Sequence, residues 1–386
     1  MTTMTYDRAG ERARVIGAYA DGRVAIPTGE AQHVWRIAGT ALLATRVIQG
    51  FVYWGGGSRR FIYAPSKLDA WGGHNWMANK FQTAMPGALF GTDHLISFLL
   101  HHFWLLYACV IMFSAAELIA GAALMAGLFT RFAALVSMAF SVVLMAMFGW
   151  QGATCIDEWT MAACNLAMGA TLLLGGSSAW SLDNVLLRRR PSLAGRGWFR
   201  WGCGALPLPL ADRRLRNLTL ALFAFVVIFD VGTYSYYRGS VVTPFHSGPV
   251  SPTMHHVTLT DGVVLPDGSV RVHAYLDAGT PEAPLHVVSA AVLAADGHVM
   301  EQWDAKALSA LPKTSFANDY AYNKFAAGPY GIRAPMGAKA TLTLPAVGSG
   351  APGSGAVGSG AVGGDSIRLT DVDGRSFTTK LVGVAG

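Results

Sequence analysis

Residues 97–131 read SFLLHHFWLLYACVIMFSAAELIAGAALMAGLFTR, and this stretch decides the fold class because it is almost entirely apolar. A helix that crosses a bilayer needs about 20 such residues, so residues 97–127 predict a membrane-spanning helix. Further apolar runs of spanning length lie at residues 34–54, 132–150, 157–176 and 217–237. The sequence therefore predicts an α-helical membrane bundle with a four-helix core and a fifth transmembrane helix.

The composition agrees with a chain that lies largely in lipid. Of its 386 residues, 52% are hydrophobic and only 13% are charged, whereas about 25% are charged in soluble domains. The first apolar run is longer than the hydrophobic part of a signal peptide, so we expect an uncleaved anchor. The expected domains are an N-terminal segment at 1–33, the four-helix domain at 34–180, a linker at 181–216, the fifth helix at 217–238 and a soluble domain at 239–386.

The distribution of arginine predicts the orientation. Eight arginines crowd the linker between the fourth and fifth apolar runs: Arg188, Arg189, Arg190, Arg196, Arg200, Arg213, Arg214 and Arg216. Because cytoplasmic loops are enriched in Lys and Arg, this linker and the N-terminus are expected in the cytoplasm. The loops at 55–96 and 150–157 and the C-terminal domain then face the periplasm, across the cytoplasmic (inner) membrane. The arginines expected at the cytoplasmic membrane surface explain the net charge of +6, so we expect no nucleic-acid partner.

The C-terminal domain has the period-two pattern of β-strands. Segments such as SVRVHAYL at 269–276, LHVVSAAVL at 285–293 and SFTTKLV at 376–382 are separated by glycine-containing turns. We predict an all-β sandwich. Residues 346–364 are a Gly/Ser/Ala/Val repeat that cannot bury a core, and they predict a flexible loop between strands.

The segment GATCIDEW at 152–159 places a thiol beside two carboxylates between two apolar runs. Asp157 is a natural helix N-cap, and Glu158 suits the first helical turn. Cys155 is expected outside the bilayer, where thiols oxidise. Cys164 lies about two turns into the next helix, so a bond to Cys155 requires the loop to fold back. A disulfide, a reactive Cys155 thiol and a structural cysteine all remain open. The candidate catalytic residues are Cys155 and Cys164 for sulfur chemistry and Asp157 and Glu158 for proton transfer.

Two charges fall inside the predicted membrane helices. Arg46 lies within the first run and Glu117 within the second. A charge in lipid is costly unless it is paired or faces a cavity. The two residues are therefore either a structural ion pair or a site for proton transfer or ligand binding.

The outer end of the second helix combines hydrogen-bonding and aromatic side chains that suit a quinone headgroup. These candidate quinone-binding residues are His101, His102, Trp104 and Tyr107. Adjacent helical residues point about 100° apart, so at most one histidine faces a given site. Ordinary interfacial residues would have the same pattern.

Positive charge also gathers on the first outer loop, against the orientation tendency. The candidate anion-binding residues are Arg59, Arg60, Lys67, His74 and Lys80. The glycines of WGGGSRR at 54–60 favour a backbone turn that binds a small oxyanion beside paired guanidinium groups. Attraction to lipid phosphate is the alternative explanation. No haem, flavin or metal motif is present in the sequence.

Three long motifs resemble known families. ELIAGAALMAGLFTR at 117–131 resembles the signature of DoxX-type four-helix membrane proteins, and its small residues suit close helix packing. The segment RVIQGFVYWGGGSRRFIYAPSKLD at 46–69, continued to TCIDEW at 154–159, resembles the DoxD subunit of thiosulfate:quinone oxidoreductase. NDYAYNKFAAGPYGIRAPMGAKATLTLP at 318–345 resembles the DoxA subunit. The chain thus looks like a fusion of the two subunits.

The resemblance implies an enzyme that oxidises two thiosulfates to tetrathionate and passes the electrons to membrane quinone, its electron acceptor. Thiosulfate, quinone and the lipid bilayer are then its partners, with a second copy of the chain and a downstream terminal oxidase as further candidates. In the DoxA-like motif, Lys324 and Arg333 are candidate substrate-binding residues. Together with Tyr320, Tyr322 and Tyr330 they form either a lid over the outer mouth or ordinary packing of the β domain.

Two routes follow for the chemistry. In one, thiosulfate attacks an oxidised Cys155, and a second thiosulfate displaces the adduct as tetrathionate. In the other, thiosulfate reacts directly with quinone while Arg59, Arg60 and Arg46 hold it. Two non-enzymatic readings also remain: a membrane subunit of a terminal oxidase, and a carrier of sulfur oxyanions.

Overall fold

The computed structural model describes residues 30–63, 65–71, 73–152, 157–238, 249–346 and 365–383. The chain forms two compact units. The first unit comprises Met1–Pro65, Val110–Val143 and Thr160–Gly232, and the second comprises Ser66–Cys109, Leu144–Trp159 and Thr233–Gly386. Four of the divisions fall within α-helices, namely Phe103–Ala126, Thr130–Phe148, Asp157–Gly175 and Asp212–Arg238, so each unit combines segments that are distant in sequence.

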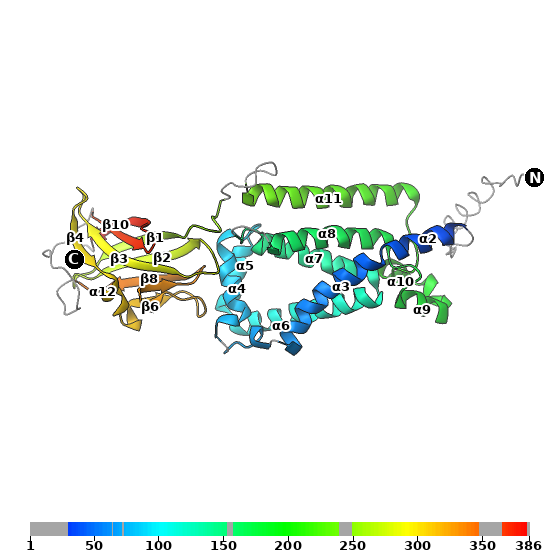
Figure 1. The fold of residues 1–386 in the computed structure, drawn as a ribbon, viewed down its shortest axis with the longest axis horizontal. Helices are drawn as coiled ribbons and strands as arrows, with labels where there is room; N and C mark the ends of the chain where they lie inside the picture. Colours follow the sequence, from blue (N-terminus) through cyan, green and yellow to red (C-terminus); the bar gives the residue numbers. More distant parts are fainter. Residues whose placement is uncertain are drawn as a thin grey trace, which may run out of the picture. The chain divides into compact units, whose positions relative to one another are not determined.

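The helices account for most of the residues before 240 (Figure 1). Their bounds are α2 Glu30–Ala41, α3 Leu43–Ser58, α4 Met77–Ala84, α5 Thr92–His101, α6 Phe103–Ala126, α7 Thr130–Phe148, α8 Asp157–Gly175, α9 Leu182–Arg189, α10 Gly197–Gly202, α11 Asp212–Arg238 and, in the C-terminal domain, α12 Ala305–Ser309. Short 3-10 turns occur at Pro65–Lys67, Gly73–Asn75, Met85–Gly87, Pro191–Gly195 and Lys313–Ser315, and a π-helical turn covers Arg59–Tyr63.

Within the described residues, three helices are long and apolar enough to cross a membrane: α6, α7 and α11. The chain is therefore a membrane protein with a C-terminal β domain. The run expected at 97–127 is interrupted at His102, whose backbone (φ −120°, ψ 77°) leaves the helical region. The run expected at 34–54 divides at Leu42 into α2 and α3. The four-helix core with a fifth helix remains a prediction.

Glycines bring α3 and α6 into backbone contact in the first unit. A Cβ atom added to Gly121 would lie 2.2 Å from the backbone nitrogen of Trp54, and one added to Gly50 would lie 2.7 Å from the carbonyl oxygen of Gly121. Without an aqueous driving force inside lipid, such close approach favours helix association through van der Waals contact. The small residues of the 117–131 motif serve this packing.

Buried polar side chains connect α3 to α7 and α8 in the same unit. The Gln49 amide nitrogen donates to the Ser137 hydroxyl at 3.0 Å and to the Asn165 carbonyl at 2.8 Å. The Tyr53 hydroxyl donates to the Ser137 carbonyl at 2.9 Å. Since polar groups buried without partners are costly, these bonds select one arrangement of the three helices.

The buried carboxylate of Asp183, in α9, binds the turn before α7 and the loop after α10 at the end of the first unit that is predicted to be cytoplasmic. Its oxygens accept from the backbone nitrogens of Phe129 at 2.7 Å, Thr130 at 3.2 Å and Gly204 at 2.7 Å, and from the Thr130 hydroxyl at 3.1 Å. The residue is fully buried. Hydrogen bonds to a charged group are stronger than neutral ones, so Asp183 is a main anchor of this end.

The C-terminal domain is a β-structure of ten strands within the described residues (Figure 1). Their bounds are β1 His256–Val264, β2 Val270–Ala278, β3 Leu285–Leu293, β4 Val299–Trp303, β5 Phe316–Asn318, β6 Ala326–Gly328, β7 Gly331–Ala334, β8 Lys339–Leu344, β9 Ser366–Asp371 and β10 Ser376–Gly383. The hydrogen-bonded path runs β5-β8-β2-β1-β10-β9-β3-β7-β6, with β4 beside β3.

This continuous path makes a nearly closed, barrel-like sheet. Its pairs are antiparallel except for β1 with β10, where Gly262 lies beside Leu381. Alternate residues of β2, such as Val270, Val272 and Ala274, are fully buried, as the sequence pattern predicts. The two-layer sandwich remains a prediction, and the predicted loop lies, from residue 347 onward, outside the described residues.

Candidate functional site

The segment between β5 and β6 is anchored to α4 within the second unit. The amide nitrogen of Gln82 donates to the carbonyls of Asn323 at 2.8 Å and Gly337 at 2.9 Å, and its oxygen accepts from the Asn323 backbone nitrogen at 2.8 Å. The Asn323 side chain donates in turn to the Thr83 hydroxyl at 2.9 Å and the Met336 carbonyl at 2.8 Å. Both Gln82 and Asn323 are buried.

Gly337 is required at this anchor. Its φ of +77° lies in the left-handed region, and a Cβ there would lie 2.1 Å from the carbonyl oxygen of Gln82. Neither Gln82 nor Asn323 was singled out from the sequence, since their pairing joins positions 241 residues apart. Asn323 stands within the quoted 318–345 motif, but nothing local to it indicates Gln82 as its partner.

His101 meets Tyr320 beside this anchor. The two rings lie 5.0 Å apart, and the Tyr320 hydroxyl lies 2.9 Å from the Ser97 hydroxyl. The His101 Nδ1 is 2.7 Å from the Ser97 carbonyl, which fixes the ring at the end of α5. His102 packs instead on Phe98, at 4.3 Å between rings. As expected for adjacent residues, the two histidines have different surroundings, and His101 is the one in contact with the β domain.

Aromatic side chains gather where α6 begins. Tyr107 lies 5.8 Å from Trp76 and 6.1 Å from Phe103, which in turn contacts Trp71 at 6.1 Å and Trp104 at 5.1 Å. Trp104 is 75% exposed, whereas Trp76 is 2% exposed. The indole N–H of Trp76 has no hydrogen-bond partner among the described residues. Since buried donors are normally satisfied, this N–H is a candidate hydrogen-bond donor to a ligand.

Arg46 and Glu117, the two charges expected inside the membrane, do not pair with each other. Glu117 accepts from Arg60, which follows α3 in the π-helical turn, and the two side chains are 12% and 15% exposed. Arg46 is buried and donates to the Trp180 carbonyl at 2.6 Å. The direct Arg46–Glu117 pair considered from the sequence is therefore replaced by Arg60–Glu117. Arg60 lies in the π-helical turn that follows α3, and in this position its guanidinium group reaches Glu117 of α6.

The remaining basic candidates lie in both units. Arg59 is exposed at the end of α3 in the first unit, whereas Lys67, His74 and Lys80 belong to the second. Lys67 is half-buried, and His74 lies in the Gly73–Asn75 turn. The Lys80 ammonium is 2.9 Å from the Glu158 carboxylate and 5.1 Å from the centre of the Phe148 ring. The fold thus brings together Lys80 and Glu158, which were predicted as candidates from separate segments.

The predicted thiol site is only partly described. Cys155 lies outside the described residues, and Asp157 is the first residue of α8. Cys164 is an exposed free thiol on α8, and Cys109 and Cys203 are also free. Burial raises the pKa of the Cys203 thiol, so this cysteine is unreactive. Among the described side chains, no three His, Cys, Asp or Glu residues gather as a metal-binding group.

The basic residues of the 318–345 motif differ in their surroundings. Lys324 is exposed in the loop before β6. Arg333 lies in β7, opposite His286 of β3, and the exposed Tyr330 ring is 5.8 Å from that histidine. Burial raises the pKa of the half-buried Tyr322. Of this motif, it is therefore Tyr320 and Asn323 that contact α5 and α4, and the lid stays a prediction.

Comparison with protein families gives two matches that divide the chain. The family model of the TQO small subunit DoxD matches residues 42–198, which include α3 to α9. The model of the TQO small subunit DoxA matches residues 237–377, which include the strands from β1 to the start of β10. No solved structure matches the chain.

Proposed function

Because this chain belongs to the thiosulfate:quinone oxidoreductase (TQO) small-subunit families DoxD and DoxA, joined in one polypeptide, we propose that it oxidises thiosulfate and reduces membrane quinone. Two thiosulfates are converted to one tetrathionate on the periplasmic side of the cytoplasmic membrane. We place the four-helix DoxX-like core at 34–180, the fifth helix at 217–238 and the β domain, as a sandwich closed into a barrel-like sheet, at 239–386. The excess of arginine in the linker supports this orientation.

One observation carries the proposal: within the second unit, residues of the DoxD region form hydrogen bonds with residues of the DoxA region. Gln82 and Ser97 come from the DoxD region, and they bind Asn323 and Tyr320 of the DoxA region. His101 lies at this junction. Two subunits that meet through buried, specific hydrogen bonds are expected to work as one catalyst, which explains why a single chain encodes both.

The overall reaction is 2 S2O3²⁻ + quinone + 2 H⁺ → S4O6²⁻ + quinol. A sulfur–sulfur bond forms between the terminal sulfur atoms, each thiosulfate loses one electron, and quinone takes up two electrons and two protons. Bringing two dianions together requires positive charge. We assign this role to basic residues of the second unit, namely Lys67, His74, Lys80, Lys324 and Arg333. Arg59, which is exposed in the first unit, is a separate candidate for binding an anion.

We assign the quinone headgroup to the aromatic cluster at the start of α6. The unpaired Trp76 N–H is a hydrogen-bond donor for a quinone carbonyl, and Tyr107 packs against the same ring. His101 supplies a proton at the junction with Tyr320. Arg46 and Glu117 instead have structural roles, because each already binds a protein group, namely Trp180 and Arg60.

The route of the electrons is either covalent or direct. In the covalent route, quinone first oxidises Cys155 and the Cys164 thiol, which is free in the structure, to a disulfide and becomes quinol. Thiosulfate then opens this disulfide to give a Cys155 thiosulfonate and a Cys164 thiolate. A second thiosulfate releases tetrathionate, and quinone re-oxidises the two thiols. Glu158 lies three positions after Cys155, and its pairing with Lys80 reduces the negative charge that would disfavour a thiolate there. In the direct route, both cysteines are structural.

The test is quinone reduction by the purified protein with thiosulfate as donor, in wild type, Cys155→Ala and Cys164→Ala. Activity of wild type with formation of tetrathionate supports the function. Loss of activity in both variants, with melting temperature unchanged, supports the covalent route, and Cys109→Ala serves as the matched control. No quinone reduction by the folded wild type would refute the function.

A further inference from the structure

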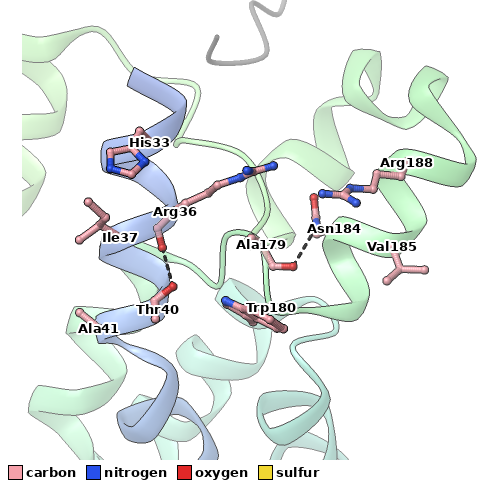
Figure 2. A pocket seen from close by; sticks show the side chains of 10 residues that line it. All are labelled: His33, Arg36, Ile37, Thr40, Ala41, Ala179, Trp180, Asn184, Val185 and Arg188. Carbon is pink, nitrogen blue, oxygen red and sulfur yellow. Dashed lines mark hydrogen bonds between the residues drawn. The ribbon is translucent and has the colours of Figure 1, made fainter. Parts of the chain in front are cut away.

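A cavity of about 850 Å³ lies in the first unit, between α2 and the segment that leads from α8 into α9. Its lining combines the basic side chains His33, Arg36 and Arg188 with the apolar side chains Ile37, Trp180 and Val185. Figure 2 shows that Arg36 and Arg188 extend from opposite helices toward the space above Trp180. None of these residues has a part in the proposed reaction.

Carboxylates of the described residues do not pair with the guanidinium groups that line this cavity. Within the described residues, the ion pairs of arginine and lysine involve Arg60, Lys80, Lys339 and Arg375, and neither Arg36 nor Arg188 contacts a carboxylate. Two guanidinium groups that flank one opening form a site for an oxyanion. Guanidinium groups bind phosphate oxygens in a bidentate manner, so phosphate is the matching group.

The apolar part of the lining indicates that the phosphate belongs to a lipid. Ile37 is 56% exposed, Trp180 63% and Val185 40%, so the open rim of this cavity presents an apolar surface, as expected where a membrane protein meets acyl chains. Tryptophan is enriched where lipid headgroups meet the hydrocarbon region. The cavity also adjoins the arginine-rich linker, which is predicted to lie at the cytoplasmic leaflet. Basic pockets between helices on that side bind anionic headgroups.

The walls of the cavity are held in place before any ligand binds. Arg46 fixes the Trp180 carbonyl at 2.6 Å. A Cβ atom added to Gly39 would lie 1.6 Å from the Ser178 hydroxyl, so α2 packs directly on the turn that carries Trp180. The Asn184 side chain donates to the carbonyl of the residue before Trp180 at 2.9 Å. A site built in this way loses little entropy when it binds a headgroup.

We propose that this cavity binds the phosphate of an anionic phospholipid of the cytoplasmic leaflet, with Arg36 and Arg188 as its ligands and Trp180 against the acyl chain. The experiment uses the purified full-length protein in detergent. Binding of phosphatidylglycerol, phosphatidylcholine and inorganic phosphate is measured by native mass spectrometry, for wild type and for Arg36→Gln/Arg188→Gln. Arg189→Gln is the control, since Arg189 is an exposed residue on the same helix that does not line the cavity.

The expected result is that phosphatidylglycerol binds at least tenfold more tightly than phosphatidylcholine, and that the double variant loses this preference while Arg189→Gln retains it. Equal loss in the control would overturn the proposal, because it would mean diffuse surface charge. Displacement of phosphatidylglycerol by millimolar inorganic phosphate would indicate a site for a free oxyanion. Displacement by a short-chain quinone would indicate a quinone site. Either displacement would overturn the lipid assignment.

Discussion

Gln82→Met tests whether the β domain is fixed to α4 through buried hydrogen bonds. Methionine has nearly the volume of glutamine, so the change removes three hydrogen bonds without opening a large cavity. It leaves the carbonyls of Asn323 and Gly337 and the Asn323 N–H buried without their partner. At about 1 kcal/mol for each lost bond, the anchor should weaken by about 3 kcal/mol.

Amide hydrogen exchange measures this loss directly. A weakening of about 3 kcal/mol should speed exchange of the peptide that contains Asn323 about 100-fold, if exchange follows local opening of the anchor. Thiosulfate-dependent quinone reduction should fall in parallel. Gln302→Met is the matched control, because Gln302 is exposed on β4, and its exchange and activity should not change. Exchange at Asn323 within about threefold of wild type would refute the anchor as described.

Three further changes test other contacts. Asp183→Asn should lower the stability of the first unit by about 3 kcal/mol, because a neutral amide cannot accept all four hydrogen bonds. The control is Asp212→Asn at an exposed position, which should change the stability by less than about 0.5 kcal/mol, and unfolding curves in detergent measure both variants. Glu117→Gln should cost about 2 kcal/mol in the same assay by leaving the Arg60 charge unpaired, and Arg60→Gln in the same chain should restore part of the loss; no recovery would contradict the pairing. Burial lowers the pKa of His286, so the unfolded chain binds its proton at higher pH and stability should fall as pH drops below about 6.5; unfolding of His286→Gln should show a weaker pH dependence, and an identical dependence would contradict this assignment.

Much of the fold follows from local patterns in the sequence. Three of the five predicted apolar runs correspond to α6, α7 and α11, because length and hydropathy alone decide whether a helix can span lipid. The alternation in 269–276 and 285–293 corresponds to β2 and β3, because side chains of a strand point alternately to the two faces. Both signals depend on neighbouring residues, which a sequence displays directly.

Contacts between distant segments could not be predicted in this way. Asn323 and Gln82 meet across 241 positions, and nothing local to either residue specifies the other. The partner of Glu117 depends on the π-helical turn after α3, whereas counting residues along straight helices suggested Arg46. The barrel-like sheet depends on the parallel pairing of β1 with β10, which joins the ends of the β domain.

The candidate site shows the same division. The sequence predicts His101 and Tyr107 as quinone-binding residues because histidine and tyrosine at the end of an apolar run suit a quinone headgroup, and this role stays a prediction. Trp76 becomes a candidate only in the fold, because it is proposed for the burial of its indole N–H without an acceptor, and burial is a property of the folded chain. Lys80 and Glu158 were each predicted, but only the fold places them 2.9 Å apart.

The ratio of products tests the central claim most directly. Purified wild-type protein is incorporated into quinone-containing liposomes with the β domain outside, and thiosulfate is added to the external solution. The account predicts that quinol and tetrathionate form in equal amounts, with the tetrathionate outside. Uptake of thiosulfate into the liposomes without quinol, or quinol formed only after a haem-containing oxidase is added, would contradict it.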